Sequence, residues 1–145
     1  MLITRTADYA LRAVIHLADA GADRPVAAAE IARAQGIPPD YVAKVLGALA
    51  RAGLVTCLPG RGGGARLLRR PAEISVLEVV EAVDGPVLLN RCLLREGECP
   101  RDRSCAAHGF WKATQQSLLR TLARAKVSQF CRRRGKPQPP AARKR

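Results

Sequence analysis

Hydrophobic residues recur at helical spacing throughout the first fifty residues of the chain. Over residues 6–20 they repeat every three to four positions, which predicts an amphipathic helix with the apolar positions Ala10, Leu11, Val14, Ile15, Leu17 and Ala18. A second, shorter helix is predicted over 26–36, where Gly36 provides a typical helix end. A third covers 37–53, with Pro38 before its first turn, where a missing amide hydrogen is harmless. The two short helices together predict a helix-turn-helix.

A pair of short strands is predicted directly after the third helix. Residues 54–58 are a strand candidate, "PGRGGG" is a turn sequence, and residues 65–68 return as the second strand. A hairpin in this place is typical of the wing of a winged helix-turn-helix. Residues 1–70 are therefore predicted to form a DNA-binding domain. Within the hairpin, Cys57 is expected to pack as a small hydrophobe.

The second half of the chain contains two more predicted helices. Ser75 and Glu78 have the spacing of a capping box, which starts a helix that ends near Gly85. Residues 86–104 show no period. A long helix is predicted over 105–130, with one side formed by Phe110, Trp111, Thr114, Leu118, Leu122 and Ala125. The predicted fold class is mainly α: a winged helix-turn-helix with a small β-hairpin wing and a long C-terminal dimerisation helix.

A long terminal helix in so small a protein has little of its own domain to pack against. We expect a homodimer, in which a second copy of the chain buries the apolar stripe across a two-fold axis. The alternative is a helix that folds back on its own domain. The chain then divides into the DNA-binding domain, a linking helix and loop over 71–104, a dimerisation helix over 105–130 and a basic, disordered tail over 131–145.

The charge of the chain favours a polyanionic partner. It has 145 residues, with 25 Lys and Arg against 12 Asp and Glu, and its formal net charge is +13. Seven Lys or Arg and no acid lie in residues 131–145, and the rest of the chain stays basic without them. This favours a double-stranded DNA operator as the partner. Neither a signal peptide nor an apolar run of membrane-spanning length is visible, so a cytoplasmic protein without membrane contact is expected.

Three cysteines and a histidine are concentrated within residues 92–108, in the spacing C-x6-C-x5-C-x2-H. The total of five cysteines is odd, which favours reduced, metal-binding thiols over disulfides. We expect Cys105 and His108 on one face at the start of the long helix, with Cys92 and Cys99 converging from the preceding loop. Structural zinc sites use closer cysteine spacing, and histidine among cysteines has precedent in iron–sulfur proteins. The spacing favours a cluster but leaves zinc, and unligated thiols, open.

The candidate DNA-contacting residues lie on the third helix and the wing, and they are Tyr41, Lys44, Arg51, Gly60, Arg61 and Arg66. Side chains near the start of a recognition helix reach bases and phosphates, and a wing tip places a cation in or beside the minor groove. The alternative for each arginine is a solvated surface charge. Nothing in the sequence resembles a catalytic constellation or a nucleotide-binding glycine loop, so an enzyme is not expected.

Four stretches, taken together, resemble the Rrf2 family of winged-helix regulators, which includes the IscR and NsrR types. They are "TADYALRAVIHLA", "LARAGLVTCLPGRGGGARL", "VLEVVEAVDGP" and "CAAHGFW", and the resemblance extends from residue 1 to about 130. It implies a homodimer in which each subunit reads one half-site. It also implies an iron–sulfur cluster held by three cysteines, which match Cys92, Cys99 and Cys105. On this resemblance a cluster is strongly preferred over zinc.

The family divides at the fourth ligand of the cluster. The IscR types resemble this chain at His108, in a Cys-x2-His-x2-Trp pattern, and carry a 2Fe-2S cluster. The NsrR types resemble it at Asp8, which reaches a 4Fe-4S cluster from the other subunit and answers nitric oxide. Both residues are present, and His108 is preferred with Asp8 as the alternative. The wing departs from the family at Pro59, where Arg or Lys is frequent, and at Ala65, where an aromatic residue is common.

The expected function is therefore a DNA-binding transcriptional regulator, homodimeric, whose operator binding is controlled by a cluster that senses iron–sulfur status, redox or nitric oxide. Assembly of the cluster is expected to order the loop over 86–104. Two alternatives stay open. One is a zinc-stabilised DNA-binding regulator without redox sensing, and the other is a metal-trafficking accessory protein whose winged helix contacts protein.

Overall fold

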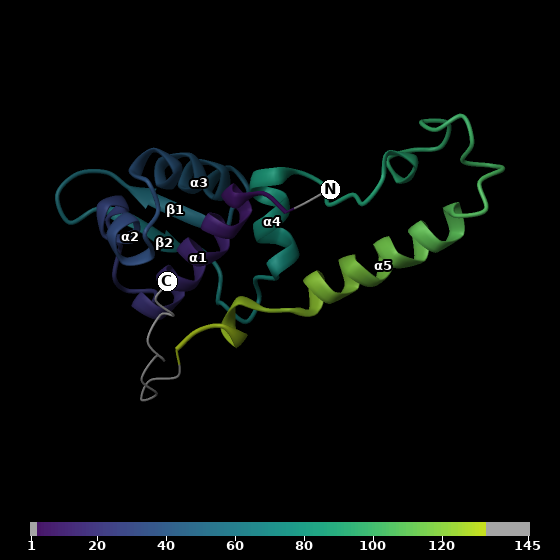
Figure 1. Cartoon of the computed structure of the whole chain (residues 1–145). Coiled ribbons are helices and arrows are strands. Elements are labelled where there is room, and N and C mark those ends of the chain that lie inside the picture. The colour runs from purple at the N-terminus through teal and green to yellow at the C-terminus, as the bar shows by residue number, and fades with distance from the viewer. Residues whose placement is uncertain (1–2, 133–145) are drawn as a thin grey trace, which may run out of the picture.

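Helices and one small sheet build the protein, and the computed structural model describes residues 3–132. In chain order this part contains α1 (Arg5–Ala20), α2 (Ala28–Gln35), α3 (Pro39–Arg51), β1 (Val55–Leu58), β2 (Gly64–Leu67), α4 (Val76–Asp84), the 3-10 turn η1 (Arg91–Leu93), α5 (His108–Arg124) and the 3-10 turn η2 (Val127–Gln129). Figure 1 shows a compact body, made of residues 3–85 and 125–132, and an arm, made of residues 86–124. The predicted fold, mainly α with a single hairpin, is confirmed for the described residues.

Helix α1 lies at the centre of the body because one of its faces is apolar and largely made of small side chains. The buried residues on that face are Ala7, Ala10, Ala13, Val14 and Leu17. It packs against α2, α3, α4 and β2. The Thr4 hydroxyl accepts the Ala7 N–H at 3.2 Å and so caps the start of the helix. The same hydroxyl donates to Asp84 Oδ1 at 2.5 Å, which ties the start of α1 to the end of α4.

Helices α2 and α3 form the predicted helix-turn-helix. Gly36 ends α2 in the left-handed conformation, with φ 60° and ψ 40°, which favours glycine. Ile37 is only 3% exposed and anchors the turn in the core. Pro38 then caps α3, whose core-facing side chains are Val42, Val45, Leu46, Ala48 and Leu49.

The hairpin of β1 and β2 is antiparallel and is fixed to the body along one edge. The Ala65 N–H donates to the Val26 carbonyl and the Val26 N–H donates to the Ala65 carbonyl, each at 2.8 Å. The neighbouring Gly64 must be a glycine, because a Cβ atom there would lie 2.4 Å from the Val26 carbonyl oxygen. Cys57 is exposed, so the expectation that it packs as a small hydrophobe is wrong. The physical reason is that only the first half of β1 is covered: Val55 is buried, whereas Cys57 and Leu58 are exposed.

The capping box predicted at the start of α4 is present. The Ser75 hydroxyl accepts the Glu78 N–H at 3.2 Å, and the Glu78 carboxylate accepts the Ser75 N–H at 2.8 Å. Arg69 adds a third partner, because its Nη1 donates to the Glu78 carboxylate at 2.6 Å. One carboxylate thus starts α4 and holds the end of the wing against it.

A pH series of stability measurements should reveal the contribution of Glu78. Burial acts to raise the pKa of Glu78, but hydrogen bonds from Arg69 and Ser75 outweigh it and hold the pKa at about 2, against 4.5 for an unperturbed carboxyl. A depressed pKa stabilises the folded state above the unfolded value, and this contribution is lost as the pH falls from 4.5 toward 2.

In that series, Glu78→Gln should lower the free energy of unfolding at pH 7 by about 1 kcal/mol, a modest figure because the side chain is 38% exposed and solvent screens the pair. The difference from the parent chain should shrink at pH 3, as followed by urea unfolding. An equal loss at both pH values would contradict this role of the charge.

The last described residues leave the helix and return to the body. The predicted helix over 105–130 is wrong at this end, because α5 stops at Arg124. The Ala125 carbonyl accepts the Val76 N–H at 2.9 Å, and the Val127 N–H donates to the Ile74 carbonyl at 3.0 Å. These bonds replace those of a continuing helix and bury Val127 completely. The hydrophobic periodicity of the sequence does not predict these hydrogen bonds.

Helix α5 divides into two halves with different surroundings. In its C-terminal half, the half-buried Leu118, Leu119 and Leu122 pack against a small apolar cluster of Ala7, Val76, Val80 and Val87. The alternative of a helix folded back on its own domain therefore holds for this half. The N-terminal half projects away from the body (Figure 1), with Phe110 64% exposed and Trp111 37% exposed. In a single chain nothing in the described residues covers these two rings fully.

Residues 133–145, most of the expected basic tail, lie outside the described residues. Arg132, at the end of the described part, donates its backbone N–H to Asp19 Oδ1 at 2.8 Å and so stays attached to the end of α1. Between residues 3 and 132, no helix is both long and apolar enough to cross a membrane.

Candidate functional site

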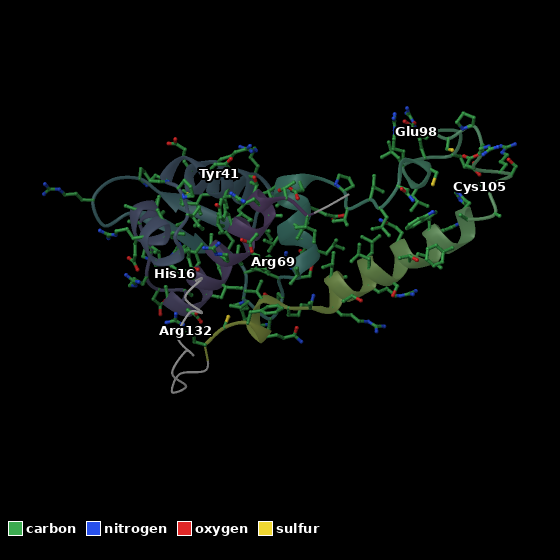
Figure 2. All side chains as sticks on the ribbon, in the orientation of Figure 1. His16, Tyr41, Arg69, Glu98, Cys105 and Arg132 are labelled. Atoms are coloured by element: carbon green, nitrogen blue, oxygen red, sulfur yellow. The ribbon has the colours of Figure 1, made fainter. Side chains whose placement is uncertain are left out.

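One face of α3 meets solvent while the other is packed into the core. The predicted DNA-contacting residues Tyr41, Lys44 and Arg51 are all exposed on it. In helix-turn-helix proteins, the exposed side of the second helix is the side that enters the major groove. Figure 2 shows Tyr41 at the surface of the body, on this helix. The fold thus leaves the three side chains available to a duplex.

The tip of the wing presents an arginine between two glycines. Gly60 and Gly62 have φ values of 87° and 71°, in the region that favours glycine. Arg61 lies between them and is exposed, and Arg66 is exposed on β2. The two positive φ angles turn the chain sharply at the tip, so that the wing presents a cation to solvent. All six positions predicted for DNA contact are solvent-accessible or at the surface.

Two side chains of α1 join this surface and were missed by the sequence reasoning. The Tyr9 ring meets the Tyr41 ring edge to face, with 5.5 Å between centroids. The Arg12 guanidinium lies 5.4 Å from the centroid of the Tyr9 ring and donates to the Asp8 carboxylate at 3.2 Å. The spacing of Tyr9 and Arg12 along α1 was a visible signal that they share a helix face. Only the packing of α1 against α3 brings them to Tyr41.

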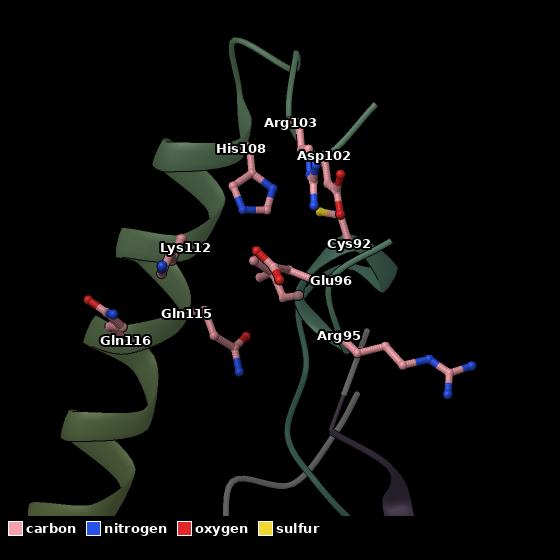
Figure 3. Close-up of a pocket in the computed structure, with 10 residues that line it drawn as sticks. Cys92, Arg95, Glu96, Asp102, Arg103, His108, Lys112, Gln115 and Gln116 are labelled. Carbon is pink, nitrogen blue, oxygen red and sulfur yellow. The ribbon is translucent and has the colours of Figure 1, made fainter. Parts of the chain in front are cut away.

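The loop of the arm lies against the start of α5 and forms a cavity of about 400 Å³. Figure 3 shows side chains from the loop and from the helix facing the same space. Most of the residues that line it have polar or charged side chains, and they include Cys92, Asp102, Arg103, His108, Lys112 and Gln115. This differs from the body, whose interior is built from Val, Leu, Ile and Ala.

Two of the four predicted metal ligands, Cys92 and His108, face this cavity from opposite walls (Figure 3). The Nδ1 atom of His108 is buried and has no hydrogen-bond partner among the described residues. A buried polar atom without a partner costs free energy unless another group binds it. The ring of His108 therefore has a nitrogen that a group bound in the cavity could satisfy.

The other two predicted ligands, Cys99 and Cys105, do not line the cavity. The Cys99 carbonyl accepts the Asp102 N–H, and the Cys105 carbonyl accepts the His108 N–H, each at 3.1 Å. Each cysteine is therefore one tight turn away from a residue that lines the cavity. Cys105 precedes α5, contrary to the expectation that it lies on the helix, because the helix begins only at His108. Figure 2 shows Cys105 at the tip of the arm.

Across residues 3–132, no three His, Cys, Asp or Glu side chains gather closely enough to hold a metal ion. The alternative fourth ligand, Asp8, lies on α1 in the body and is paired with Arg12. It does not line the cavity that Cys92 and His108 share. An Asp8 ligand would therefore have to come from a second copy of the chain.

The loop that carries the cysteines is held mainly by polar contacts near its surface. Glu98 accepts a hydrogen bond from Arg95 at 2.8 Å and lies 3.9 Å from Arg91. The Gly97 N–H donates to Asp102 at 2.7 Å. No residue of the segment 88–107 belongs to the buried core of the described chain. Exposed ion pairs contribute little, so a ligand bound between loop and helix would add much of the stability of the loop.

One buried polar side chain joins this loop to α5. Gln115 is only 7% exposed. Its Oε1 accepts the Leu89 N–H at 2.9 Å, and its Nε2 donates to the Val87 carbonyl. The two bonds hold the segment that leads from the end of α4 into η1, where Cys92 lies.

Comparison with known proteins gives a consistent result. The chain matches the Rrf2 family, described as iron-dependent transcriptional regulators, over residues 3–133. It is 37% identical over 112 residues to the HTH-type transcriptional regulator IscR of Aliivibrio salmonicida, an alignment that covers 77% of this chain and 66% of that protein. The chain thus spans about two thirds of the length of this relative. Because the matching family is one of transcriptional regulators, the expectation that the chain is not an enzyme is confirmed.

Solved structures share the fold at lower identity. CymR, the global cysteine regulator of B. subtilis, superposes with a TM-score of 0.73 at 22% identity, covering 90% of this chain and 95% of that chain. IscR of T. potens superposes with a TM-score of 0.71 at 22% identity, covering 90% of this chain and 85% of that chain. At this identity the likeness concerns the fold alone, and it confirms the winged-helix architecture.

Proposed function

Because the chain belongs to the Rrf2 family of transcriptional regulators, we propose that it is a homodimeric, cytoplasmic regulator whose affinity for a DNA operator depends on an iron–sulfur cluster. The observation that carries the proposal is the buried Nδ1 of His108, which has no hydrogen-bond partner among the described residues and belongs to a side chain that shares a cavity with Cys92. Nε2 of His16 is also buried without a hydrogen-bond partner, but it lies 3.7 Å from the Glu30 carboxylate, whereas His108 lines the cavity that Cys92 also faces.

The ligands of the proposed cluster are Cys92, Cys99, Cys105 and His108. Thiolates with an imidazole are a donor set that suits iron–sulfur clusters. A 2Fe-2S cluster is favoured with His108, and a 4Fe-4S cluster with Asp8 from a second copy is the alternative. When bound, the cluster supplies a crosslink between the loop and α5 that is sensitive to iron supply and to redox conditions.

The proposed crosslink would change the conformation of the loop that carries the cysteines. To bind the cluster, Cys99 and Cys105 would turn toward the cavity. This requires only that a surface loop rearranges, and the loop is held by ion pairs such as that of Arg95 with Glu98. An ordered loop would then fix the arm relative to the body. Operator binding follows if the fixed arrangement is the one in which both copies of α3 and the wing match the duplex.

A second copy of the chain is proposed to cover the projecting half of α5. Phe110 and Trp111 pack edge to face, with 5.2 Å between centroids, and present an aromatic surface to solvent. Exposed aromatic pairs of this kind are common at the centres of protein interfaces. A two-fold axis through this surface would present two winged helices to two half-sites of an operator.

The decisive test is an anaerobic absorption spectrum of the purified, reconstituted chain, with iron and sulfide assayed on the same sample. Structured visible bands with about two iron and two sulfide per chain support the His108-ligated cluster. A broad shoulder with about four of each would shift the fourth ligand to Asp8. A colourless chain with one zinc after reconstitution would replace the sensor by a zinc-stabilised DNA-binding regulator. Failure to retain any duplex from a random-sequence pool would favour a metal-trafficking accessory protein.

Replacing Arg61 by alanine should weaken DNA binding and reduce its dependence on salt. Arg61 lies exposed at the wing tip, where a phosphate contact would release a bound counterion. The slope of the logarithm of the binding constant against the logarithm of salt concentration should fall by about 0.9, which is one contact's worth. The measurement is a salt series of fluorescence anisotropy on a duplex that the wild-type protein has selected from a random pool.

Arg101→Ala is the matched control for Arg61→Ala, because it removes the same charge from an exposed position on the arm. It should leave the slope within error of the parent chain. An unchanged slope in Arg61→Ala would reject a phosphate contact by this residue. An equal change in both variants would assign the effect to net charge instead.

A further inference from the structure

We propose that Gln115 is a positioning residue for the metal centre, one that sets how closely the segment bearing Cys92 approaches His108. This inference rests on the proposed metal centre. Gln115 lines the same cavity as Cys92 and His108, but its amide is bonded to backbone rather than aimed at the space between them. It therefore acts through its neighbours and is not itself a ligand.

The two bonds of Gln115 define a register between helix and loop. Its amide offers one acceptor and one donor, and it uses them on the Leu89 N–H and the Val87 carbonyl. The two groups belong to residues two apart, so both bonds act on the same short stretch of backbone. A shift of the segment by one residue would break both bonds at once. Both bonds of Gln115 can therefore form in only one position of the segment 87–89 along α5.

The connections on both sides of Gln115 are short or rigid. Leu89 is three residues before Cys92, and η1 begins at Arg91, so little chain is available to absorb a displacement. On the other side, Gln115 is seven residues after His108 in the same α-helix, which places both on one face about two turns apart. Fixing the segment at Gln115 therefore restricts where the thiol of Cys92 lies relative to the ring of His108.

A gain in folding stability is a weak explanation for an amide at this position. The next residues on the same face are Leu118, Leu119 and Leu122, which pack against the body. A leucine at position 115 would continue that apolar stripe without burying an amide. A satisfied buried hydrogen bond contributes little to the net free energy of folding. It does, however, restrict the bonded groups to a narrow range of distances and angles. The function that remains for Gln115 is to specify the geometry of the loop.

The first test uses the full-length, metal-free chain and needs no cluster. Gln115→Leu removes both bonds with a side chain of similar volume, and Gln116→Leu is the matched control, because Gln116 lines the same cavity but is exposed. Hydrogen exchange of the Leu89 amide should accelerate by about tenfold or more in Gln115→Leu. It should stay unchanged in Gln116→Leu, and the amides of α1 and α3 should stay protected in both variants, which shows that the body is folded.

The second test uses the chain reconstituted anaerobically with iron and sulfide, and it follows release of iron to a ferrous chelator. Release should be about tenfold faster in Gln115→Leu than in the parent chain or in Gln116→Leu. A double-mutant cycle with His108→Ala separates positioning from general destabilisation. If Gln115 acts by placing Cys92 opposite His108, then Gln115→Leu should add little to the release rate once His108 is already alanine.

The outcomes distinguish this inference from the proposed function. An unchanged Leu89 amide in Gln115→Leu overturns the inference, and so does an additive double-mutant cycle or an equal effect of Gln116→Leu. Each of these failures appears only in the variants. Failure of the proposed metal centre would instead appear in the parent chain, as absence of iron after reconstitution, and it would overturn the role of Gln115 toward a metal along with it.

Discussion

Iron binding should be lost completely when Cys99 is replaced by alanine, while the body of the protein stays folded. Cys99 would supply one of only three thiolates in the proposed ligand set, so its removal should prevent the cluster from assembling. The core is built from side chains of the body, such as Leu17, Ile31 and Leu49, none of which lies on the arm. The measurement is iron and sulfide per chain after anaerobic reconstitution, with the Tm of the same sample followed by circular dichroism. The Tm of the metal-free Cys99→Ala chain should match that of the metal-free parent.

Cys99 is a sharper choice than Cys92 because it does not line the cavity in the structure. Its place among the ligands requires the loop to rearrange, so the variant tests that rearrangement directly. Cys57→Ala is the control, since it removes an exposed thiol from the wing and should leave the iron content unchanged. Iron retained in Cys99→Ala would remove this residue from the ligand set. Iron lost equally from both variants would indicate a general requirement for thiols instead of a defined site.

A charge placed at Phe110 should separate the proposed homodimer into single chains. Phe110 is 64% exposed, although it is a large aromatic side chain, and it packs against Trp111 on the projecting half of α5. In Phe110→Glu, a carboxylate would have to be buried in the interface without a partner, which costs several kcal/mol. We expect sedimentation velocity to show a monomer at micromolar concentration. Operator affinity should fall at least about a hundredfold, because one winged helix then binds one half-site.

Leu68→Glu is the matched control for Phe110→Glu. Leu68 is 55% exposed, so the substitution also places a carboxylate at an exposed apolar side chain, but on the body beyond the wing. It should leave the dimer intact. A dimer that survives in Phe110→Glu and dissociates in Leu68→Glu would move the interface from the arm to the body. A parent chain that sediments as a monomer would reject the homodimer itself.

Cys99→Ala and Phe110→Glu both act near the N-terminal end of α5. The cavity lies where the loop meets the first turns of α5, and the exposed aromatic pair lies on the same turns. The second half of α5 packs on α4, which packs on α1 and α3 in the body. A change at the arm therefore has a continuous path of packed side chains toward the DNA-binding surface. Such a path allows coupling between the two sites, and measured DNA affinity with and without iron would give its size.

The helices and the hairpin of the body could be predicted from local features of the sequence. The apolar spacing of α1 and α3, the glycine at the end of α2 and the capping box at Ser75 each depend on residues within a few positions of one another. Local rules of this kind act before any tertiary contact forms, so they can be read without a structure. The glycines of the wing belong to the same group, since their backbone angles are needed wherever the hairpin lies.

The ends of α5 could not be read in this way. Its C-terminal end is decided by bonds from Ala125 and Val127 to a segment about fifty residues earlier in the chain. Its start at His108 depends on how the preceding loop turns. The exposure of Cys57 also depends on tertiary structure, because the packing of the other elements decides which part of the hairpin is covered.

The candidate site also combines features that the sequence predicts with features that depend on tertiary structure. By itself, the sequence determined the residue types and their order: three cysteines and a histidine before a long helix, and cations on a predicted recognition helix and wing. Only the tertiary structure decided that His108 and Cys92 share a cavity, that Nδ1 of His108 has no partner in the described chain, and that Gln115 fixes the loop to α5. The physical reason is that chemistry belongs to single side chains, whereas burial and register arise between segments that lie far apart in the sequence.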